Sequence, residues 1–330
     1  MKYNQLGDSG VKISAITFGA WAIGGWMWGG SDKKDAIEAI DKSLDMGIST
    51  IDTAPIYGFG LSEELVGEAL KGKRHRAQIL TKYGMRWEGN KGQFGFKSQF
   101  NDGSPVDIYK YAGKESVIKE CEDSLRRLRT DYIDLYQIHW PDSTTPIEET
   151  MEAMAQLLQQ GKIRASGVCN YSAEQMKIAD KVVKQVTNQV PYSMVERNIE
   201  KEVMPYCVET GKGILAYSPL QRGLLTGKIT DDYRFEKDDH RPNTVFFKPQ
   251  NRRQINAMLD HLRPMAEQHN ATLAQLVINW TIQQPAVVAA LVGARNARQV
   301  DENAKALGFM LNATEIQQIN DLLSELKLTS

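Results

Sequence analysis

Eight short aliphatic segments, each followed by a segment of helical period, predict that this chain is an α/β protein folded as a (β/α)8 TIM barrel. The units follow one another without a polar linker, and glycines end the helices just before buried strands. The predicted strands are residues 15–18, 49–53, 78–82, 132–138, 163–168, 187–190, 213–218 and 286–292. A doubly wound open sheet with extra strands is the alternative.

The segment Lys114–Leu128 shows the helical period most clearly. Val117, Cys121 and Leu125 recur every four residues and place an apolar stripe on one face, while the opposite face is charged. Around Gly161, the text LLQQGKIRASGV is typical of a helix, a glycine stop and a buried strand, which is the junction that a barrel repeats.

Segments outside the eight predicted units are expected to form a hairpin, an extra helix and two long loops around the barrel. The residues before Ala15 predict a hairpin that turns at residues 7–10 and closes the bottom of the barrel, and an extra C-terminal helix is expected from near Ala313 to near Lys327. Two long irregular stretches, about 84–113 and about 219–249, are expected to be lids or binding loops. Residues 1–330 are expected to form one barrel domain.

The charge balance favours a small-molecule partner. The chain has 40 basic and 41 acidic residues, so no strong field would attract nucleic acid or an anionic membrane. Cys121, Cys169 and Cys207 are an odd number without close pairs, which argues against a disulfide framework and indicates a reducing compartment. The N-terminus lacks an apolar signal region, and the longest apolar run, 286–294, is far shorter than the ~20 residues that span a bilayer. We therefore expect a soluble, cytoplasmic protein.

Four polar residues lie at or just after the ends of three neighbouring predicted strands: Asp52, Tyr57, Lys82 and His139. In a TIM barrel the carboxyl ends of the strands meet at one rim, where active sites occur. Each residue alone has a structural explanation, such as an ion pair, a core cap or a hydrogen-bonded histidine. Their conjunction at one rim indicates a catalytic group.

Three segments carrying these residues resemble the aldo-keto reductase family, and the resemblance runs over nearly the whole chain. They are GISTIDTAPIYG (47–58), the pair Thr81 and Lys82 at a strand end, and DYIDLYQIHWPD (131–142). The segment WAIGGWMWGG (21–30) further resembles a bacterial branch of the family.

The resemblance implies a role for each catalytic residue. Reducing a carbonyl needs a hydride donor and a proton donor, and Tyr57 would supply the proton. Because a free tyrosine has a pKa of ~10, the charge of Lys82 is expected to lower the pKa of Tyr57. Asp52 would hold Lys82 charged, and His139 would donate a hydrogen bond to the substrate oxygen.

A Rossmann site is not expected, because GFGLSE (58–63) lacks the third glycine of GxGxxG. By resemblance the cofactor is NADPH. Asn170 and Gln189 would bind the nicotinamide carboxamide, Tyr217 would stack on its ring, residues 218–228 would cover the pyrophosphate, and Arg295 would pair with the 2′-phosphate. The full expected set is Ala20, Trp21, Asp52, Asn170, Gln189, Tyr217, Ser218, Leu220, Gln221, Gly223, Lys228, Gly293, Arg295, Gln299, Glu302 and Asn303. Cys169 stands where the family commonly has serine, and a thiol is a weak donor.

The aromatic residues leave the substrate open. One interpretation is that they form a pocket for sugars or aryl carbonyls, and the other is that they only pack a long loop against the barrel. The residues are Trp87, Phe94, Phe96, Phe100, Tyr109 and Tyr111 in the loop, and Trp26, Trp28 and Trp140 at other strand ends.

The predicted function is NADPH-dependent reduction of aldehydes or ketones to alcohols. The alternative is an NADPH-binding regulatory subunit with little turnover that binds a partner protein. A metal-dependent hydrolase is a weaker interpretation, because only His139 lies at a predicted strand end and no HxH or HExxH pair occurs, so no metal is expected.

Overall fold

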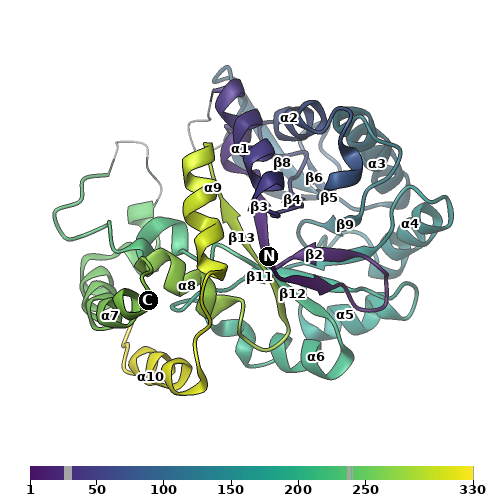
Figure 1. Cartoon of the computed structure of the whole chain (residues 1–330). Coiled ribbons are helices and arrows are strands. Elements are labelled where there is room, and N and C mark those ends of the chain that lie inside the picture. Colours follow the sequence, from purple (N-terminus) through teal and green to yellow (C-terminus); the bar gives the residue numbers. More distant parts are fainter. Residues whose placement is uncertain (26–31, 236–238, 240, 330) are drawn as a thin grey trace.

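A computed structural model describes residues 1–25, 32–235, 239 and 241–329. Eight strands form a closed barrel: β3 (Ile16–Gly19), β4 (Thr50–Asp52), β5 (Gln78–Tyr83), β9 (Leu135–Ile138), β10 (Ser166–Cys169), β11 (Thr187–Pro191), β12 (Gly213–Tyr217) and β13 (Val287–Gly293). Each pairs in parallel with the next along the chain, and β13 closes the ring on β3 (Figure 1). All eight predicted strands and the (β/α)8 fold are confirmed.

Side chains alternate between the inside and the outside of the barrel, as the period of two in a strand requires. On β5 and β9, Ile79 and Tyr136 belong to the large core that lies under the helices. Leu80 and Leu135, one residue away on each strand, belong to a second core inside the barrel. The residues two positions further on, Lys82 and Gln137, therefore point inward as well.

Ten α-helices lie in the described ranges: α1 (Lys33–Asp45), α2 (Leu61–Ala69), α3 (Lys114–Leu128), α4 (Ile147–Gln159), α5 (Ala173–Asp180), α6 (Val203–Thr210), α7 (Pro249–Gln268), α8 (Leu273–Thr281), α9 (Ala297–Ala304) and α10 (Ala313–Ser324). Helix α3 has the predicted bounds, and α10 is the expected C-terminal addition. Figure 1 shows α7 and α10 outside the ring of barrel helices. Among the described helices, none is both long and apolar enough to cross a bilayer.

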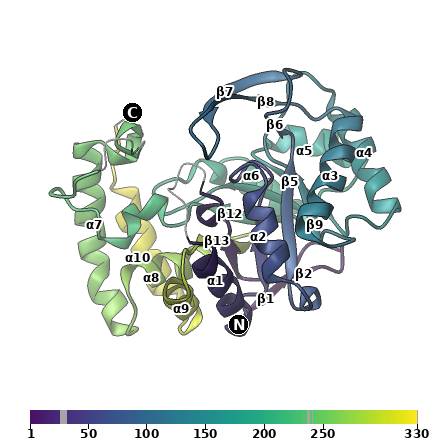
Figure 2. The same cartoon turned by 90° about the horizontal axis from the view of Figure 1, so that it is seen from above.

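The predicted N-terminal hairpin is present and consists of β1 (Tyr3–Gln5) and β2 (Lys12–Ser14). Its apolar residues Leu6, Val11 and Ile13 pack into the core inside the barrel. The hairpin thereby closes the amino ends of the strands, and Figure 2 shows it at the opposite end of the barrel from β7 and β8 (Gln93–Gln99 and Pro105–Lys110).

The prediction of an irregular segment at 84–113 was wrong. This segment is a three-stranded antiparallel sheet in the order β6 (Met85–Arg86), β8, β7, which we call the insert sheet. Its strands are half-exposed and are held by pairing with one another. They do not need a continuous apolar face, so the alternation of apolar and polar residues along them is weak. Its two ends meet, because Tyr111 N donates to the Gly84 carbonyl at 3.0 Å. Carboxylates fix both ends: Gly84 N donates to Glu120 and Ala112 N to Asp142, each at 2.9 Å.

The second long stretch, 219–249, contains short 3-10 helices in its described part: η4 (Gln221–Thr226), η5 (Arg241–Asn243) and η6 (Val245–Phe247). Arg241 joins two of these turns, since its Nη1 donates to the Arg222 carbonyl at 3.2 Å. Trp26 and Trp28, expected near the rim, lie outside the described residues.

Gly67 in α2 offers a stability test of helix packing. A Cβ at this position would lie 2.5 Å from the Arg127 carbonyl oxygen of α3, which is backbone and cannot move aside. Gly67→Ala should therefore lower the free energy of unfolding by about 1–3 kcal/mol, although alanine is the better helix former. The measurement is urea unfolding. Glu64→Ala on the exposed face of α2 is the control, and a stabilised Gly67→Ala variant would contradict the close packing.

Candidate active site

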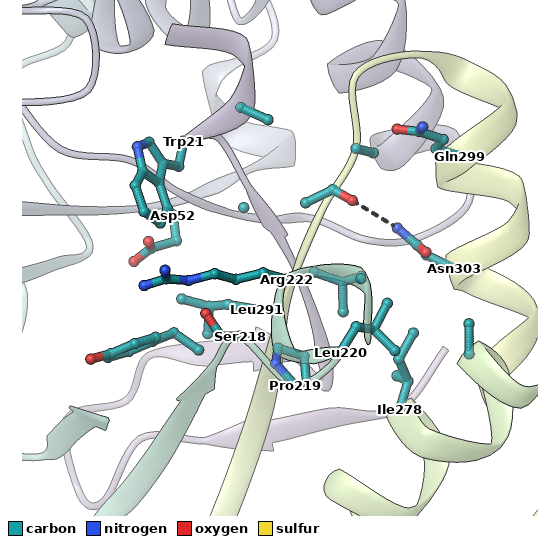
Figure 3. A pocket seen from close by; sticks show the side chains of 18 of the residues that line it. Trp21, Asp52, Ser218, Pro219, Leu220, Arg222, Ile278, Leu291, Gln299 and Asn303 are labelled. Atoms are coloured by element: carbon teal, nitrogen blue, oxygen red, sulfur yellow. Dashed lines mark hydrogen bonds between the residues drawn. The ribbon is translucent and has the colours of Figure 1, made fainter. Parts of the chain in front are cut away.

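A cavity of about 900 Å³ opens at the carboxyl ends of the barrel strands. Its lining begins at Trp21, Tyr57 and His139 and extends to Arg295 and Asn303. In Figure 3, Trp21 and Asp52 lie at one end and Gln299 and Asn303 at the other. The cavity is therefore elongated, as a site for an extended cofactor and a small substrate requires.

An ion pair is buried at the inner end of the cavity. Lys82 Nζ, at the end of β5, donates to Asp52 Oδ1 at 2.6 Å and to the Thr53 carbonyl at 2.8 Å. Gln189 Nε2, from β11, donates to the other carboxylate oxygen of Asp52 at 2.8 Å. The side chains of Lys82 and Asp52 are 0% and 3% exposed. Strands on opposite sides of the barrel thus fix the carboxylate.

Tyr57 lies in the turn after β4, in contact with the ion pair. A Cβ at Gly24 would lie 2.6 Å from the Tyr57 carbonyl oxygen, so this glycine lets the chain after β3 approach the turn. The Tyr57 ring stacks on Trp21 with 5.8 Å between centroids and meets the edge of His139 at 5.7 Å. Lys82 Nζ lies 5.0 Å from the centre of the Tyr57 ring. The structure therefore brings together all four residues of the predicted catalytic group.

Burial dominates the electrostatics of this group. Burial raises the pKa of Tyr57 to about 12, although the nearby charge of Lys82 lowers it. Lys82 thus acts in the predicted direction, but the expected net lowering of the Tyr57 pKa was wrong. Burial also raises the pKa of Asp52 against the effect of Lys82. For Lys82, burial favours the neutral amine, but the Asp52 carboxylate together with Tyr57 and Cys169 outweighs burial and raises the pKa, so the ammonium is charged at neutral pH.

His139 is neutral in this environment. Burial, with a smaller contribution from the charge of Lys82, holds the pKa of the imidazole well below its usual range. A neutral imidazole keeps one N–H donor. The backbone carbonyl of His139 accepts from Asn170 Nδ2 at 3.0 Å, which ties β9 to the end of β10.

The chain is similar to known proteins over nearly its whole length. The model of the aldo/keto reductase family matches residues 15–324. The chain belongs to this family. It is 41% identical to the aldo-keto reductase YhdN of Bacillus subtilis, over 98% of this chain and 94% of that protein. Its structure resembles that of a glycerol dehydrogenase from Gluconobacter oxydans, with a TM-score of 0.88 and 40% identity over 97% of this chain and 94% of the other. As an aldo-keto reductase the chain is an oxidoreductase of carbonyl compounds that uses a nicotinamide cofactor.

Other relatives of this aldo-keto reductase differ in their described properties. An NADH-specific methylglyoxal reductase of Escherichia coli is 36% identical over 99% of this chain and its own whole length. An aldo-keto reductase of Klebsiella pneumoniae, solved with NADPH, has a TM-score of 0.73 and 29% identity over 98% of this chain and 95% of the other. A probable voltage-gated potassium channel subunit beta of Arabidopsis thaliana is 32% identical over 96% of this chain and 94% of its own.

The cavity contains most of the residues expected to bind the cofactor. Its lining includes Trp21, Asp52, Asn170, Gln189, Tyr217, Ser218, Leu220, Gly223, Lys228, Gly293, Arg295, Gln299, Glu302 and Asn303. Three predicted site residues do not line it. Ala20 is buried and its carbonyl accepts from Ser62 at 2.9 Å, Gln221 accepts from Ser193 at 3.1 Å, and Lys82 lies behind Asp52.

The chemistry of this lining fits a nicotinamide dinucleotide. Near Tyr57 it offers amides and a flat ring, with the Tyr217 hydroxyl donating to Asn170 Oδ1 at 3.0 Å. At the other end it offers the cations Arg295 and Lys305 and the first turn of α9. Asn303 Nδ2 donates to the Gly293 carbonyl at 3.3 Å, drawn as a dashed line in Figure 3, and Arg295 N donates to Gln299 at 2.8 Å.

The sequence analysis missed several residues of the lining. Arg222 is the most informative, since its side chain points into the cavity in Figure 3 and its backbone is left-handed at φ 52°. The sign of it in the sequence was a charged residue within residues 218–228, which were expected to cover the pyrophosphate. Gly19, Met85 and Lys305 also line the cavity, as does Cys169, which the sequence analysis had named. Groups of three or more His, Cys, Asp or Glu side chains that could hold a metal are absent from the described residues.

The aromatic residues divide between the two expected roles. Phe96 and Trp140 line the cavity, as a substrate wall requires. Trp87 and Phe100 instead pack on Phe59, with ring centroids 5.5 and 4.6 Å away. Phe94 packs on Tyr109 within the insert sheet, and half of its surface is exposed.

The ion pair predicts a pH-dependent loss of stability in Lys82→Met. Removing one partner of a buried pair costs about 3–5 kcal/mol, because the other charge stays buried alone. In the variant, the pKa of Asp52 in the folded chain would lie further above its pKa in the unfolded chain. The protonated carboxyl therefore stabilises the folded chain at low pH. This stabilisation is fully present below the unfolded pKa and is lost as pH rises through the folded pKa. Denaturant unfolding between pH 5 and 8 should therefore show a deficit that grows with pH.

The double variant Asp52→Asn/Lys82→Met is the control for this experiment. It leaves no carboxylate at position 52, so its stability should not depend on pH in the same way. A deficit in Lys82→Met that is independent of pH would show that packing, and not charge, accounts for the loss.

Proposed function

We propose that this chain reduces aldehydes or ketones to alcohols with NADPH, and that Tyr57 donates the proton. The observation that supports this proposal is the Tyr57 ring, held between Trp21 and His139 next to the charged Lys82 at the inner end of the cavity. A phenol in this position faces the space in which a carbonyl would lie.

The pKa of about 12 suits Tyr57 to the reduction. The phenol keeps its proton at neutral pH and releases it only to an oxygen that has become strongly basic, which is the state of a carbonyl oxygen after reduction. Lys82 stabilises the phenolate that remains. Asp52 and the Thr53 carbonyl hold Lys82 in place, so that its charge does not move during the reaction.

His139 would orient the substrate. Its neutral imidazole donates from the wall facing Tyr57, so a carbonyl oxygen between the two rings receives one hydrogen bond from each. When bound, NADPH supplies the hydride. Asn170, Gln189 and Tyr217 would hold its nicotinamide, and Met85, Phe96 and Trp140 would enclose an apolar substituent of the carbonyl compound.

The preference for NADPH rests on the far end of the cavity. Arg295 and Lys305 both line it, and a 2′-phosphate is the group of NADPH that cations would select. The Klebsiella relative supports this assignment, since it was solved with NADPH. The Escherichia coli relative is an NADH-specific reductase, so the cofactor preference differs among the relatives and the cations of this cavity decide it here.

A regulatory subunit is the second candidate, and the similarity to a potassium channel subunit beta favours it. The complete catalytic group favours the enzyme. Turnover of NADPH with a panel of aldehydes and ketones separates the two, because a regulatory subunit would bind the cofactor without consuming it.

Tyr57→Phe should bind NADPH normally but reduce carbonyls at least about a hundredfold more slowly, because general acid catalysis contributes a factor of this size. Absorbance of the nicotinamide follows turnover, and quenching of tryptophan fluorescence follows binding. Tyr83→Phe is the matched control: it removes a buried hydroxyl without a partner among the described residues and should stay active. A Tyr57→Phe variant with near-normal kcat would remove Tyr57 as the acid.

Arg295→Ala should weaken NADPH by about ten- to a hundredfold and NADH far less, because a charge-assisted contact contributes roughly 1.5–3 kcal/mol. Titration of each variant with both cofactors gives the dissociation constants. Arg298→Ala, near the start of α9 but outside the cavity lining, is the control. Equal losses for both cofactors would place Arg295 away from the 2′-phosphate.

A further inference from the structure

The Gln137 amide is buried inside the barrel, on the strand next to Lys82. Gln137 lies on β9 directly opposite Lys82 of β5 in the parallel register. Because Leu135 belongs to the core inside the barrel, the alternation of side chains also turns Gln137 inward. Its side chain is 0% exposed.

Gly167 on β10 makes room for this side chain. It is the register partner of Gln137, and a Cβ at Gly167 would lie 3.2 Å from Gln137 Cγ and 2.4 Å from Thr187 Oγ1. A larger residue at 167 would therefore collide with Thr187 and crowd Gln137. The barrel interior contains a small polar layer formed by Gln137 and Thr187.

Neither the nitrogen nor the oxygen of the Gln137 amide makes a hydrogen bond of normal length and angle to a described residue. A buried amide without a partner opposes folding, so an apolar side chain of the same size would be the more stable choice. The Gln137 amide is nevertheless close enough to Asp52 to lower the pKa of this carboxyl, after the larger contributions of Lys82 and Gln189 and against the effect of burial. Gln189 acts on the same carboxylate through its 2.8 Å hydrogen bond.

We propose that Gln137 is a positioning residue for the reduction proposed above: its amide dipole supports the ionised Asp52 carboxylate from within the barrel, so that Asp52 keeps its contact with Lys82. Gln137 is level with Lys82 in the register and does not line the cavity. It therefore acts through Asp52, Lys82 and Tyr57 in turn. This inference rests on the proposed function only for its effect on turnover.

The test measures the Asp52 carboxyl directly. Protein labelled with carboxyl-¹³C aspartate is titrated by NMR, with Asp52→Asn used to assign the signal. In Gln137→Met, which keeps the side-chain length and removes the amide dipole, the Asp52 pKa should rise by about one unit. Gln137→Leu repeats the test if the Met variant does not fold. Thr187→Val removes the other buried polar group of this layer and should leave the Asp52 pKa unchanged.

Kinetics supply the second readout. Because the ionised form of Asp52 is lost as pH falls, the acid limb of kcat for carbonyl reduction should move to higher pH by the same shift in Gln137→Met, with KM for the carbonyl unchanged. The thermal midpoint should stay the same or rise, since an unpaired buried amide is removed.

The outcomes separate the possibilities. An unchanged Asp52 titration in folded Gln137→Met or Gln137→Leu overturns the proposal and leaves Gln137 as a packing residue. Equal shifts in Gln137→Met and Thr187→Val also overturn it, because general polarity of the layer would then be the cause. A wild-type chain without carbonyl turnover refutes the proposed function, but the NMR titration still decides the role of Gln137.

Discussion

The buried ion pair of Asp52 and Lys82 constrains the rest of the site. Two charges withdrawn from water cost more than their attraction returns unless each has further partners. The barrel supplies these partners from separate strands: the Thr53 carbonyl for the ammonium and Gln189 for the carboxylate. The segments that enclose this pair are packed closely: the chain at Gly24 approaches the turn of Tyr57. The same burial keeps the imidazole of His139 neutral.

One structural rule produces both the core and the site. Inward residues are apolar near the hairpin, as Leu80 and Leu135 are, and polar two residues later, as Lys82 and Gln137 are. The same strand therefore stabilises the barrel with one inward side chain and contributes to the site with the next.

Much of this arrangement was predictable from the sequence. The eight strands, the hairpin, helix α3 and the meeting of Asp52, Tyr57, Lys82 and His139 follow from periodicity and from the rule that strand ends share one rim. The insert sheet was not predictable, because its half-exposed strands pair with each other and lack a clear apolar pattern. The Tyr57 pKa required the actual burial of the ring, which outweighs the charge of Lys82. Arg222 depends on a left-handed turn that no local pattern indicates.

The insert sheet begins and ends at adjacent points of the barrel. Gly84 and Tyr111 are joined by a backbone hydrogen bond, and the carboxylates of Glu120 and Asp142 hold the two ends from α3 and from the segment after β9. The length and sequence between these points can change without moving β5 or α3. Met85 and Phe96 of this sheet line the cavity, while the four residues of the predicted catalytic group lie on other segments, so the sheet is an exchangeable module for enzyme engineering. Met85 and Ile108 of the sheet pack with Tyr57, so a grafted hairpin that keeps these two residues would alter which molecules enter and leave the reacting groups in place.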